Sequence, residues 1–344
     1  MAGVYGNSFL TIAATRAVNP DESCFSRRPG PATTVHSVHV RHSRRFPNTQ
    51  SAETTQSFPL LCRGWAYQER ILAPRVLHFG PDEVVRECRE NRQCESGRNK
   101  YYLHEVDKGT FFRCITAPPS ADNQRQVRNL WCHIVVQYTA FDLTKSSDVL
   151  PALSGLAELM SRSRQGEDYL AGLWSGSLIT DLLWYRYRES YRHGPKAIPG
   201  PAEETWRAPT WSWASVYGGR VLYPQALYRN RQDLVSSYCQ VVKAECTPAG
   251  ASKTGQITSG HIKLQCPILK MPTDGVNSFH FWVDNGYANS IGDNVYVCRI
   301  AKVGRYEYWL VLEAVNLEDQ EFRRIGLAGH SLAWPRETTV ITVH

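Results

Sequence analysis

The sequence predicts an α+β protein with a mixed N-terminal part, a helical middle and a β-rich C-terminal part that forms a sandwich or a barrel. Three observations support this prediction. A short helix followed by a buried strand is indicated at 63–80, amphipathic helical spacing occurs between 127 and 160, and short β-rich runs fill the sequence from 238 onward. We expect the three parts to span residues 1–110, 111–200 and 201–344.

A dense group of charged and aromatic residues lies at 63–80, in the sequence RGWAYQERILAPRVLHFG. Residues 65–72 are long enough for two helical turns, and Pro74 would end that helix. The apolar run at 76–79 is typical of a buried strand. Charged side chains beside a buried strand need partners, so this stretch is either an internal network of ion pairs or the edge of a functional site.

The sequence before this stretch holds one predicted strand and one irregular segment. Residues 8–17 contain a short apolar run that predicts a buried strand, although little sequence precedes it to supply a neighbour. Residues 26–60 are rich in Ser, Thr, Pro, Arg and His, which is typical of an exposed loop or an irregular β segment.

The middle of the chain carries three predicted helices. The first has apolar residues at three- and four-residue spacing, which indicates an amphipathic helix: Val127, Leu130, Trp131, Ile134, Val135 and Tyr138. A second helix is predicted up to Met160, with Ser146 or Ser147 as its cap and Pro151 in its first turn. A third is expected at about 178–187, before a linker rich in Pro and Gly at 193–209.

The last part alternates short β-rich runs with Gly, Pro, Asn and Asp, a spacing that favours a β-sandwich or a barrel. The runs lie at 238–246, 261–266, 279–283, 295–300, 306–315, 321–326 and 338–343.

Composition and charge narrow the classes of function. Apolar residues make up 42% of the chain and charged residues 21%, which is typical of a globular protein. The net charge is +7, but the basic residues are scattered, whereas a nucleic-acid-binding stripe concentrates them among aromatic residues. We therefore expect no nucleic-acid partner. The oligomeric state is left open.

The N-terminus and the ten cysteines predict a cytoplasmic protein with reduced thiols. Residues 1–7 lack a charged and apolar signal sequence, and no run of 18 apolar residues predicts a membrane span. The cysteines form no CxxC pair and show no zinc-ligand spacing with histidine. Cys62 next to Arg63 is a possible thiolate, but a single cysteine beside an apolar run is more often inert. No metal site is expected.

Tryptophan and tyrosine are abundant, with ten and 17 residues, and several lie near the junction of the helical and β-rich parts. Trp211 and Trp213 alternate along one extended segment, so both side chains point to the same face. Two interpretations remain open. These aromatic residues form a tryptophan-rich core, or they line an apolar small-molecule pocket. The pocket residues would be Trp65, Trp174, Trp184, Tyr185, Trp211, Trp213 and Tyr217.

Four segments together resemble the fungal heterokaryon incompatibility (HET) domain family. They are 5–28 with LTIAA and FSRR, 63–79 with RGWAYQER and PRVLHF, 131–184 with ALSGL and YLAGLW, and 208–216 with APTWSWASV. Each segment is moderately specific, and their order makes the resemblance more specific. They cover most of the chain.

The resemblance implies a fold and a role. In the family, the first half of the HET domain precedes the strand that corresponds to residues 10–14, and it begins an α/β sheet related to the Toll/interleukin receptor fold. Only nine residues precede Leu10 here, so we expect a truncated α/β HET remnant at 1–110. The family is associated with self/non-self recognition and programmed cell death.

Two functions from different classes follow. The first is a HET-derived cyclase of fungal secondary metabolism, a Diels–Alderase-like pericyclase that folds a terpenoid or polyketide substrate. Such catalysis needs a shaped apolar cavity and a few hydrogen-bond donors, and no cofactor. GxGxxG, P-loop, HExxH and GxSxG motifs do not occur. The candidate donors are Arg63, Tyr67 and His78, and Arg63, Glu69 and Arg75 are expected to form structural ion pairs.

The alternative is a non-enzymatic HET-type regulator of heterokaryon incompatibility or programmed cell death, which binds a partner through its β-rich part. A third option is NAD cleavage with Glu69 as the carboxylate, as in some Toll/interleukin receptor-like domains. The expected truncation of the sheet disfavours it.

Overall fold

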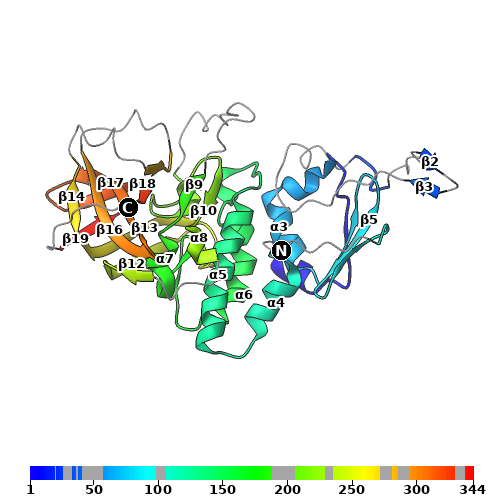
Figure 1. Ribbon diagram of the computed structural model, residues 1–344, viewed down its shortest axis with the longest axis horizontal. Helices are drawn as coiled ribbons and strands as arrows, with labels where there is room; N and C mark the ends of the chain where they lie inside the picture. Colours follow the sequence, from blue (N-terminus) through cyan, green and yellow to red (C-terminus); the bar gives the residue numbers. More distant parts are fainter. Residues whose placement is uncertain are drawn as a thin grey trace. The chain divides into compact units, whose positions relative to one another are not determined.

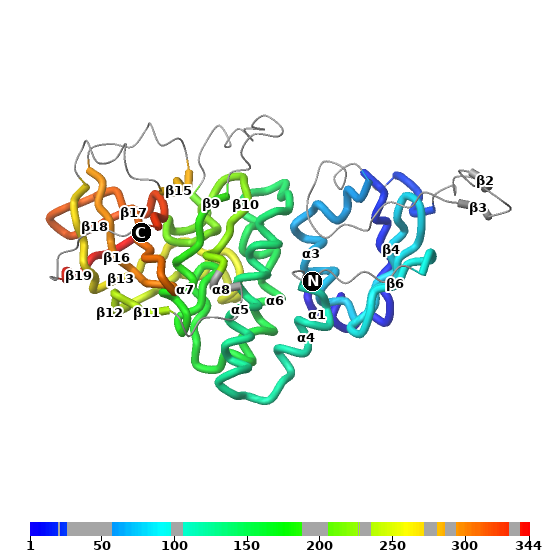
Figure 2. Tube along the Cα trace, viewed as in Figure 1, coloured from blue at the N-terminus to red at the C-terminus, as the bar shows by residue number. Residues whose placement is uncertain are grey.

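The structure is a computed structural model that describes residues 1–19, 21–25, 33–35, 38–40, 57–97, 106–187, 206–228, 235–271, 281–285, 294–329 and 338–344. Both helices and strands are present, which confirms the α+β class. The chain forms two compact units (Figure 1; Figure 2). Unit 1 comprises residues 1–119 and 137–144, and unit 2 comprises residues 120–136 and 145–344. The division into three parts at 110 and 200 stays a prediction.

Unit 1 is built on a sheet whose described strands follow the order β1-β4-β5-β6. Strand β1 is parallel to β4, and the other neighbours are antiparallel. The described elements are α1 (Ala2–Gly6), β1 (Thr11–Ala13), β2 (Thr33–Val35), β3 (Val38–Val40), η1 (Pro59–Cys62), α3 (Gly64–Leu72), β4 (Arg75–Phe79), β5 (Val84–Cys88), β6 (Arg92–Cys94) and α4 (Lys108–Thr116). The irregular segment predicted at 26–60 lies largely outside the described residues.

Helix α3 and strand β4 confirm the helix and the strand that residues 63–80 predict. The helix ends at Leu72, two residues before Pro74, where its backbone becomes extended. At its start, the Gly64 N–H donates to the Asp142 carbonyl at 2.8 Å. A Cβ on Gly64 would lie 2.7 Å from Cδ2 of Leu143, so the glycine permits this close approach.

Strand β1 corrects the expectation of a buried strand at residues 8–17. It is the outermost strand of the sheet in the part of unit 1 that the structure describes. Leu10 and Ile12 are 42% and 64% exposed. Among the described residues the apolar run is therefore an edge strand, with β4 as its one strand neighbour.

The helices of unit 2 partly follow the predicted pattern. Helix α5 (Ala121–Tyr138) carries the predicted apolar stripe, and all six of its named residues are buried. Helix α6 (Ser154–Ser161) is shorter than predicted and follows two 3₁₀ turns, η2 (Ser146–Asp148) and η3 (Pro151–Leu153). The remaining short elements are β7 (Tyr169–Leu170), β8 (Leu173–Trp174), η4 (Ser175–Ser177), α7 (Leu178–Asp181), β9 (Tyr185–Tyr187), η5 (Trp213–Ser215), β10 (Arg220–Leu222) and α8 (Gln225–Tyr228).

The helix predicted at 178–187 is wrong in its second half. Helix α7 ends at Asp181, and residues 185–187 form β9, which pairs with β10. Leu182, Leu183 and Trp184 between them are all fully buried. A run that is buried on every side has no polar face, so periodicity alone could not distinguish helix from strand.

The C-terminal part of unit 2 is a curled, half-barrel sheet. Each of the seven predicted β-rich runs overlaps one of its strands. The strands are β11 (Val235–Ser237), β12 (Gln240–Pro248), β13 (Ile257–Cys266), β14 (Ile268–Lys270), β15 (Phe281–Val283), β16 (Val295–Val303), β17 (Tyr306–Asn316), β18 (Glu321–Gly329) and β19 (Thr339–Val343).

The sheet curls because its two ends are connected by the chain. Its main path runs β11-β16-β17-β18-β19-β13-β12. Strands β11 and β12 lie at opposite ends of this path, yet only residues 238–239 separate them. Strand β13 continues into β14, which pairs with β16 near the other end. The connection between β11 and β12, the end of β13 and strand β16 therefore meet where the sheet closes.

None of the described helices is both long enough and apolar enough to cross a membrane.

Candidate functional site

Unit 1 contains a buried charge cluster made of Thr15, Arg70, His78, Glu87 and Lys108. The Glu87 carboxylate accepts hydrogen bonds from Arg70 Nε at 2.8 Å and Arg70 Nη2 at 3.1 Å. His78 Nε2 lies 3.0 Å from Oε2 of Glu87, and His78 Nδ1 lies 3.1 Å from Oγ1 of Thr15. Lys108 Nζ lies 3.9 Å from Oε2 of Glu87 and donates to the Arg70 carbonyl.

Burial and charge set the protonation of this cluster. Burial lowers the pKa of His78 to about 4, so the imidazole is neutral at pH 7, although Glu87 opposes the shift. Burial alone would raise the pKa of Glu87, but Arg70 and Lys108 hold that pKa well below its usual value. Burial lowers the pKa of Lys108 to about 8. The cluster is thus a compensated ion group that ties α3, β4, β5 and α4 together.

The structure does not place the three predicted hydrogen-bond donors around one space. Arg63 is exposed at the start of α3. Tyr67 is buried, and its hydroxyl donates to Gln137 at 3.0 Å. His78 is 1% exposed within the charge cluster. Sequence proximity grouped these residues, but helix α3 and strand β4 direct their side chains to different partners.

The ion pairs expected among Arg63, Glu69 and Arg75 do not form in the part of unit 1 that the structure describes. Glu69 instead lies close to Tyr5, where burial first and then Glu69 raise the pKa of the Tyr5 hydroxyl to about 12. Arg75 donates to the Phe9 carbonyl at 3.3 Å. The ion pair of this region joins α3 to β5 through Arg70 and Glu87. The fold brings these residues of neighbouring elements closer together than residues that follow one another along one element.

The predicted tryptophan residues of unit 2 form a core. Trp174, Trp184 and Trp211 are 0% exposed and Trp213 is 1% exposed. An indole with no exposed surface cannot form the wall of a pocket that a substrate contacts, so the pocket prediction is wrong for these four residues. The core interpretation, which the sequence left open, applies to them.

Hydrogen bonds fix this core. The Nε1 atoms of Trp131 and Trp213 donate to the Gly172 carbonyl at 2.8 and 2.9 Å. Trp184 Nε1 donates to the Trp211 carbonyl at 2.9 Å. Gly172 has a φ of +95°, and a Cβ there would lie 2.7 Å from the Trp213 ring. Glycine is therefore required at this turn for both its conformation and its size.

The other predicted pocket residues keep some exposed surface. Tyr185 stacks on Trp282 with ring centroids 4.5 Å apart, and Trp282 is 39% exposed. The Arg207 guanidinium lies 4.1 Å from the ring centroid of Tyr217. Trp65 is half-buried on α3 in unit 1. Trp282 was not predicted, because one aromatic residue in a short β-rich run gives no sign of its partner.

A second group that the sequence did not predict is the Arg324–Asp284 pair in unit 2. Arg324 Nε donates to Asp284 at 2.9 Å, and its Nη atoms donate to the carbonyls of Leu182 and Trp184 at 2.7 and 2.5 Å. Burial raises the pKa of Asp284 to about 6, although Arg324 opposes this. The guanidinium fastens β18 to the segment after α7, so its role is structural.

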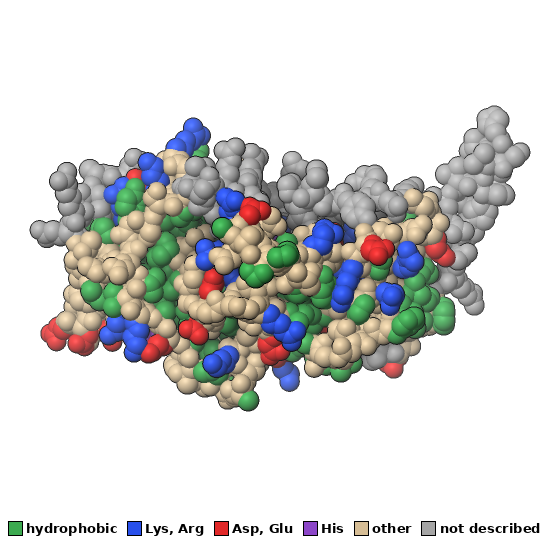
Figure 3. Space-filling view, turned by 90° about the horizontal axis from the view of Figure 1, so that it is seen from below, with side chains coloured by type: hydrophobic (Ala, Val, Ile, Leu, Met, Phe, Trp, Pro, Cys, Tyr) green, Lys and Arg blue, Asp and Glu red, His purple; other side chains and the backbone are tan. Residues whose placement is uncertain are grey.

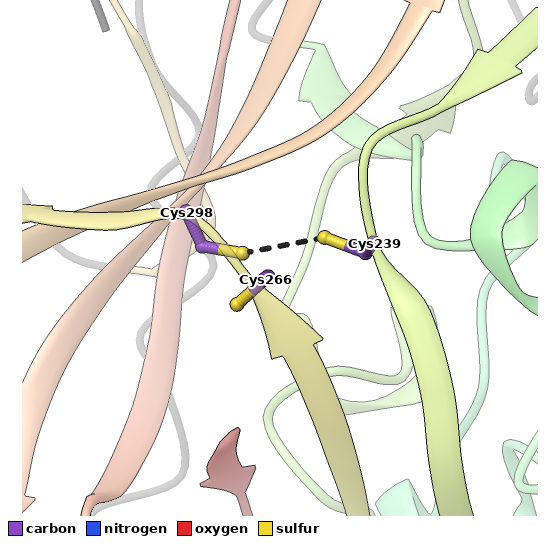
Figure 4. A group of neighbouring side chains, drawn as sticks. All are labelled: Cys239, Cys266 and Cys298. Atoms are coloured by element: carbon purple, nitrogen blue, oxygen red, sulfur yellow. Dashed lines mark hydrogen bonds between the residues drawn. The ribbon is translucent and has the colours of Figure 1, made fainter. Parts of the chain in front are cut away.

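Three thiols meet where the curled sheet closes (Figure 4). The Sγ atoms of Cys239, Cys266 and Cys298 all lie within 4.8 Å of one another. Those of Cys239 and Cys298 are 3.7 Å apart. Cys266 and Cys298 are 0% exposed, and Cys239 is 9% exposed. Sequence spacing missed this group because the three residues come from three separate strands or connections.

Comparisons with known proteins add no family assignment. No protein-family model, no curated protein and no solved structure matches the chain.

Proposed function

We propose that the chain is a non-enzymatic recognition protein of the HET type, which binds a partner through the outer edge of strand β1. The residues of the HET resemblance support the class of protein. The exposed apolar side chains of this edge carry the proposal. Together they favour partner recognition, the second of the two functions that the sequence left open, with the binding surface on unit 1 instead of on the β-rich part.

The outer edge of β1 combines exposed apolar side chains with backbone groups that a further strand could pair. Phe9 is 82% exposed, Leu10 42% and Ile12 64%. Strand β1 pairs with β4 on one side, and it has no second strand neighbour among the described residues. Hydrophobic side chains are visible on the surface of unit 1 at the right of Figure 3. Strand addition at such an edge gains both backbone hydrogen bonds and apolar contact.

The edge is held in place before a partner arrives. Thr15, just after β1, is fully buried and contacts His78 through its hydroxyl. The Arg16 N–H donates to the Phe79 carbonyl at 3.2 Å. The Arg75 guanidinium lies 5.1 Å from the ring centroid of Phe9. A partner strand would therefore bind an ordered template, which lowers the entropic cost of association.

The proposal is tested by inducible expression in hyphae of a filamentous fungus, with cell death scored by dye uptake at matched protein levels. We expect wild type to cause cell death and Ile12→Lys to lose the effect, because a charge at the edge opposes apolar strand addition. Val340→Lys, at a residue of β19 that is 46% exposed, is the matched control and keeps the effect. The free energy of unfolding of purified Ile12→Lys should lie within about 0.5 kcal/mol of the wild-type value.

Either of two results contradicts the proposal. If the wild-type protein causes no cell death, the proposed biological role is wrong. If Ile12→Lys still causes cell death, strand β1 is not the binding surface.

The cyclase remains a second candidate because of the Tyr185–Trp282 stack. Both rings are partly exposed, and a Cβ on the neighbouring Gly329 would be 3.4 Å from Trp282 and 3.5 Å from Tyr308. The rings thus pack over a residue without a side chain. An aromatic surface of this kind suits an apolar substrate such as a terpenoid or a polyketide, with the Tyr185 hydroxyl as a hydrogen-bond donor.

Binding of an apolar fluorescent probe, an anilinonaphthalene sulfonate, tests this candidate. We expect Trp282→Ala to weaken probe binding about tenfold, which corresponds to about 1.4 kcal/mol. Trp206→Ala is the control, because Trp206 is 52% exposed and lies away from this stack in the sequence. Equal binding by wild type and both variants would remove the aromatic surface, and with it the support for a cyclase.

A further inference from the structure

We propose that Cys239, Cys266 and Cys298 bind one Cu(I) ion at the closure of the curled sheet. This proposal is independent of the recognition function of unit 1. It rests on the position of three buried sulfur atoms that the fold brings together from distant parts of the sequence.

Each sulfur comes from a different part of the closure. Cys239 lies between β11 and β12, Cys266 is the last residue of β13, and Cys298 lies in β16. The connection around Cys239 lies against β16, because the Tyr238 N–H donates to the Ile300 carbonyl at 2.9 Å. On the other side of the group, β14 pairs Ile268 with Cys298 directly after β13 ends. Backbone pairing therefore positions all three thiols without a metal.

The spacing of the sulfurs fits a three-coordinate ion. Three sulfurs at about 2.3 Å from one central ion, in one plane, lie about 4.0 Å apart. The observed separation of Cys239 and Cys298 is 3.7 Å, and none of the three separations exceeds 4.8 Å. Side-chain adjustments of less than about 1 Å would bring all three sulfurs to the ion, and the sulfurs of Cys239 and Cys298 already point toward each other in Figure 4.

The donor set favours Cu(I) over Zn(II). Thiolates are soft ligands, and they select Cu(I), Zn(II) and iron–sulfur clusters. A structural Zn(II) site takes four ligands, and among the described residues no histidine, aspartate or glutamate joins the three cysteines. Burial of Cys266 and Cys298 leaves little room for a water as the fourth ligand. Three-coordinate thiolate ligation is a geometry that Cu(I) accepts.

Proton release accompanies binding. Binding forms three copper–sulfur bonds and releases the thiol protons to the solvent, and copper stays Cu(I) throughout. Cys239, the most exposed of the three, marks the side of entry.

A bound ion would cross-link the closure. It would join the β11–β12 connection, the end of β13 and strand β16 through a single ion. Because the unfolded chain does not hold the three thiols together, Cu(I) binding would stabilise unit 2 by mass action.

The experiment is an anaerobic titration of the full-length reduced protein with Cu(I) against a chromophoric Cu(I) chelator. We expect one ion per chain to be withdrawn from the chelator, and X-ray absorption to show three sulfurs at about 2.3 Å. Cys239→Ser should lower the affinity by more than about 100-fold, the upper figure for loss of an outer-shell partner. The matched control is Cys246→Ser on β12, a partly exposed cysteine outside the group, which should match wild type.

A second measurement needs no variant. Mass spectrometry after thiol alkylation of wild type should show that Cu(I) protects Cys239 and leaves Cys24 reactive. The proposal is overturned if Cys239→Ser and Cys246→Ser bind Cu(I) equally, or if Cu(I) leaves the alkylation of Cys239 unchanged. Tighter binding of Zn(II) than of Cu(I) would overturn the assignment of the metal.

Discussion

The imidazole of His78 lies between Oε2 of Glu87, 3.0 Å from its Nε2 atom, and Oγ1 of Thr15, 3.1 Å from its Nδ1 atom. This arrangement connects the exposed edge strand β1 to the charged interior of unit 1. It also gives a direct dependence of stability on pH, because the buried ring stays neutral in the folded state.

The first prediction concerns this pH dependence. The pKa of His78 is lowered to about 4 in the folded protein, against 6.5 for the free side chain. Between these values the unfolded state binds a proton that the folded state excludes, so the stability that His78 contributes is present above pH 6.5 and is lost as pH falls toward 4. The loss is on the order of 2 to 3 kcal/mol. Urea unfolding from pH 4 to 7.5 measures it.

The variants isolate the contribution of His78. In His78→Gln, the slope of the unfolding free energy with pH should be shallower than in wild type over this window. His261→Gln replaces a partly exposed ring and should keep the slope of wild type. A slope that is equal in wild type and His78→Gln would contradict the prediction.

The second prediction has the opposite sign and concerns Asp181 in unit 2. Burial raises the pKa of its carboxyl from 3.8 to about 6, although Arg164 and the hydrogen bonds from Trp174 and Ser177 oppose the shift. The folded state then binds a proton more tightly than the unfolded state. The stability of wild type relative to Asp181→Asn should therefore fall as pH rises from 3.8 to 6, by on the order of 2 to 3 kcal/mol. A difference that stays constant over this range would contradict the prediction.

The third prediction compares adjacent arginines of β18. Arg324 is 3% exposed and donates to Asp284 and to two carbonyls, so Arg324→Met leaves a buried carboxylate without its partner. We expect a loss of about 3 to 5 kcal/mol in the free energy of unfolding, measured by urea denaturation. Arg323 pairs with Glu313 at the surface, and Arg323→Met should cost less than about 1 kcal/mol. Equal losses in the two variants would show that the buried pair contributes no more to the free energy of unfolding than the surface pair.

The fourth prediction separates backbone strain from steric overlap at two glycines of unit 2. Gly166 has a φ of +80°, and no other atom lies within 4 Å of the position that a Cβ would take, so Gly166→Ala should cost about 1 to 2 kcal/mol from conformation alone. Gly172→Ala adds overlap with the Trp213 ring, and overpacking of a core typically costs about 1 to 3 kcal/mol more. Thermal unfolding of both variants tests the order. A Gly172→Ala protein as stable as Gly166→Ala would contradict the close approach.

Local sequence patterns predict the elements whose two faces differ clearly in polarity or whose ends are marked by proline or turn residues. The stripe of α5 repeats at helical spacing, and Pro74 separates α3 from β4. The seven C-terminal runs are β-rich and bounded by turn residues, and each overlaps a strand. Local patterns do not predict the structure where this contrast is missing. At 182–187 the buried residues have no polar face. At Leu10–Ile12 the apolar run predicts an interior strand, whereas β1 lies at the edge of the sheet in the described part of unit 1.

The sequence by itself determined the α+β class, the helix and strand of residues 63–80, and a C-terminal part made of short strands. These depend on chain-local properties: side-chain periodicity, proline and turn residues. Only the tertiary structure decided that Arg70 pairs with Glu87, that four tryptophans are core, and that Cys239, Cys266 and Cys298 meet at the closure of the curled sheet. Such contacts join residues that are distant in the chain. Strand order and register determine which of these residues come together, and no local pattern encodes strand order or register.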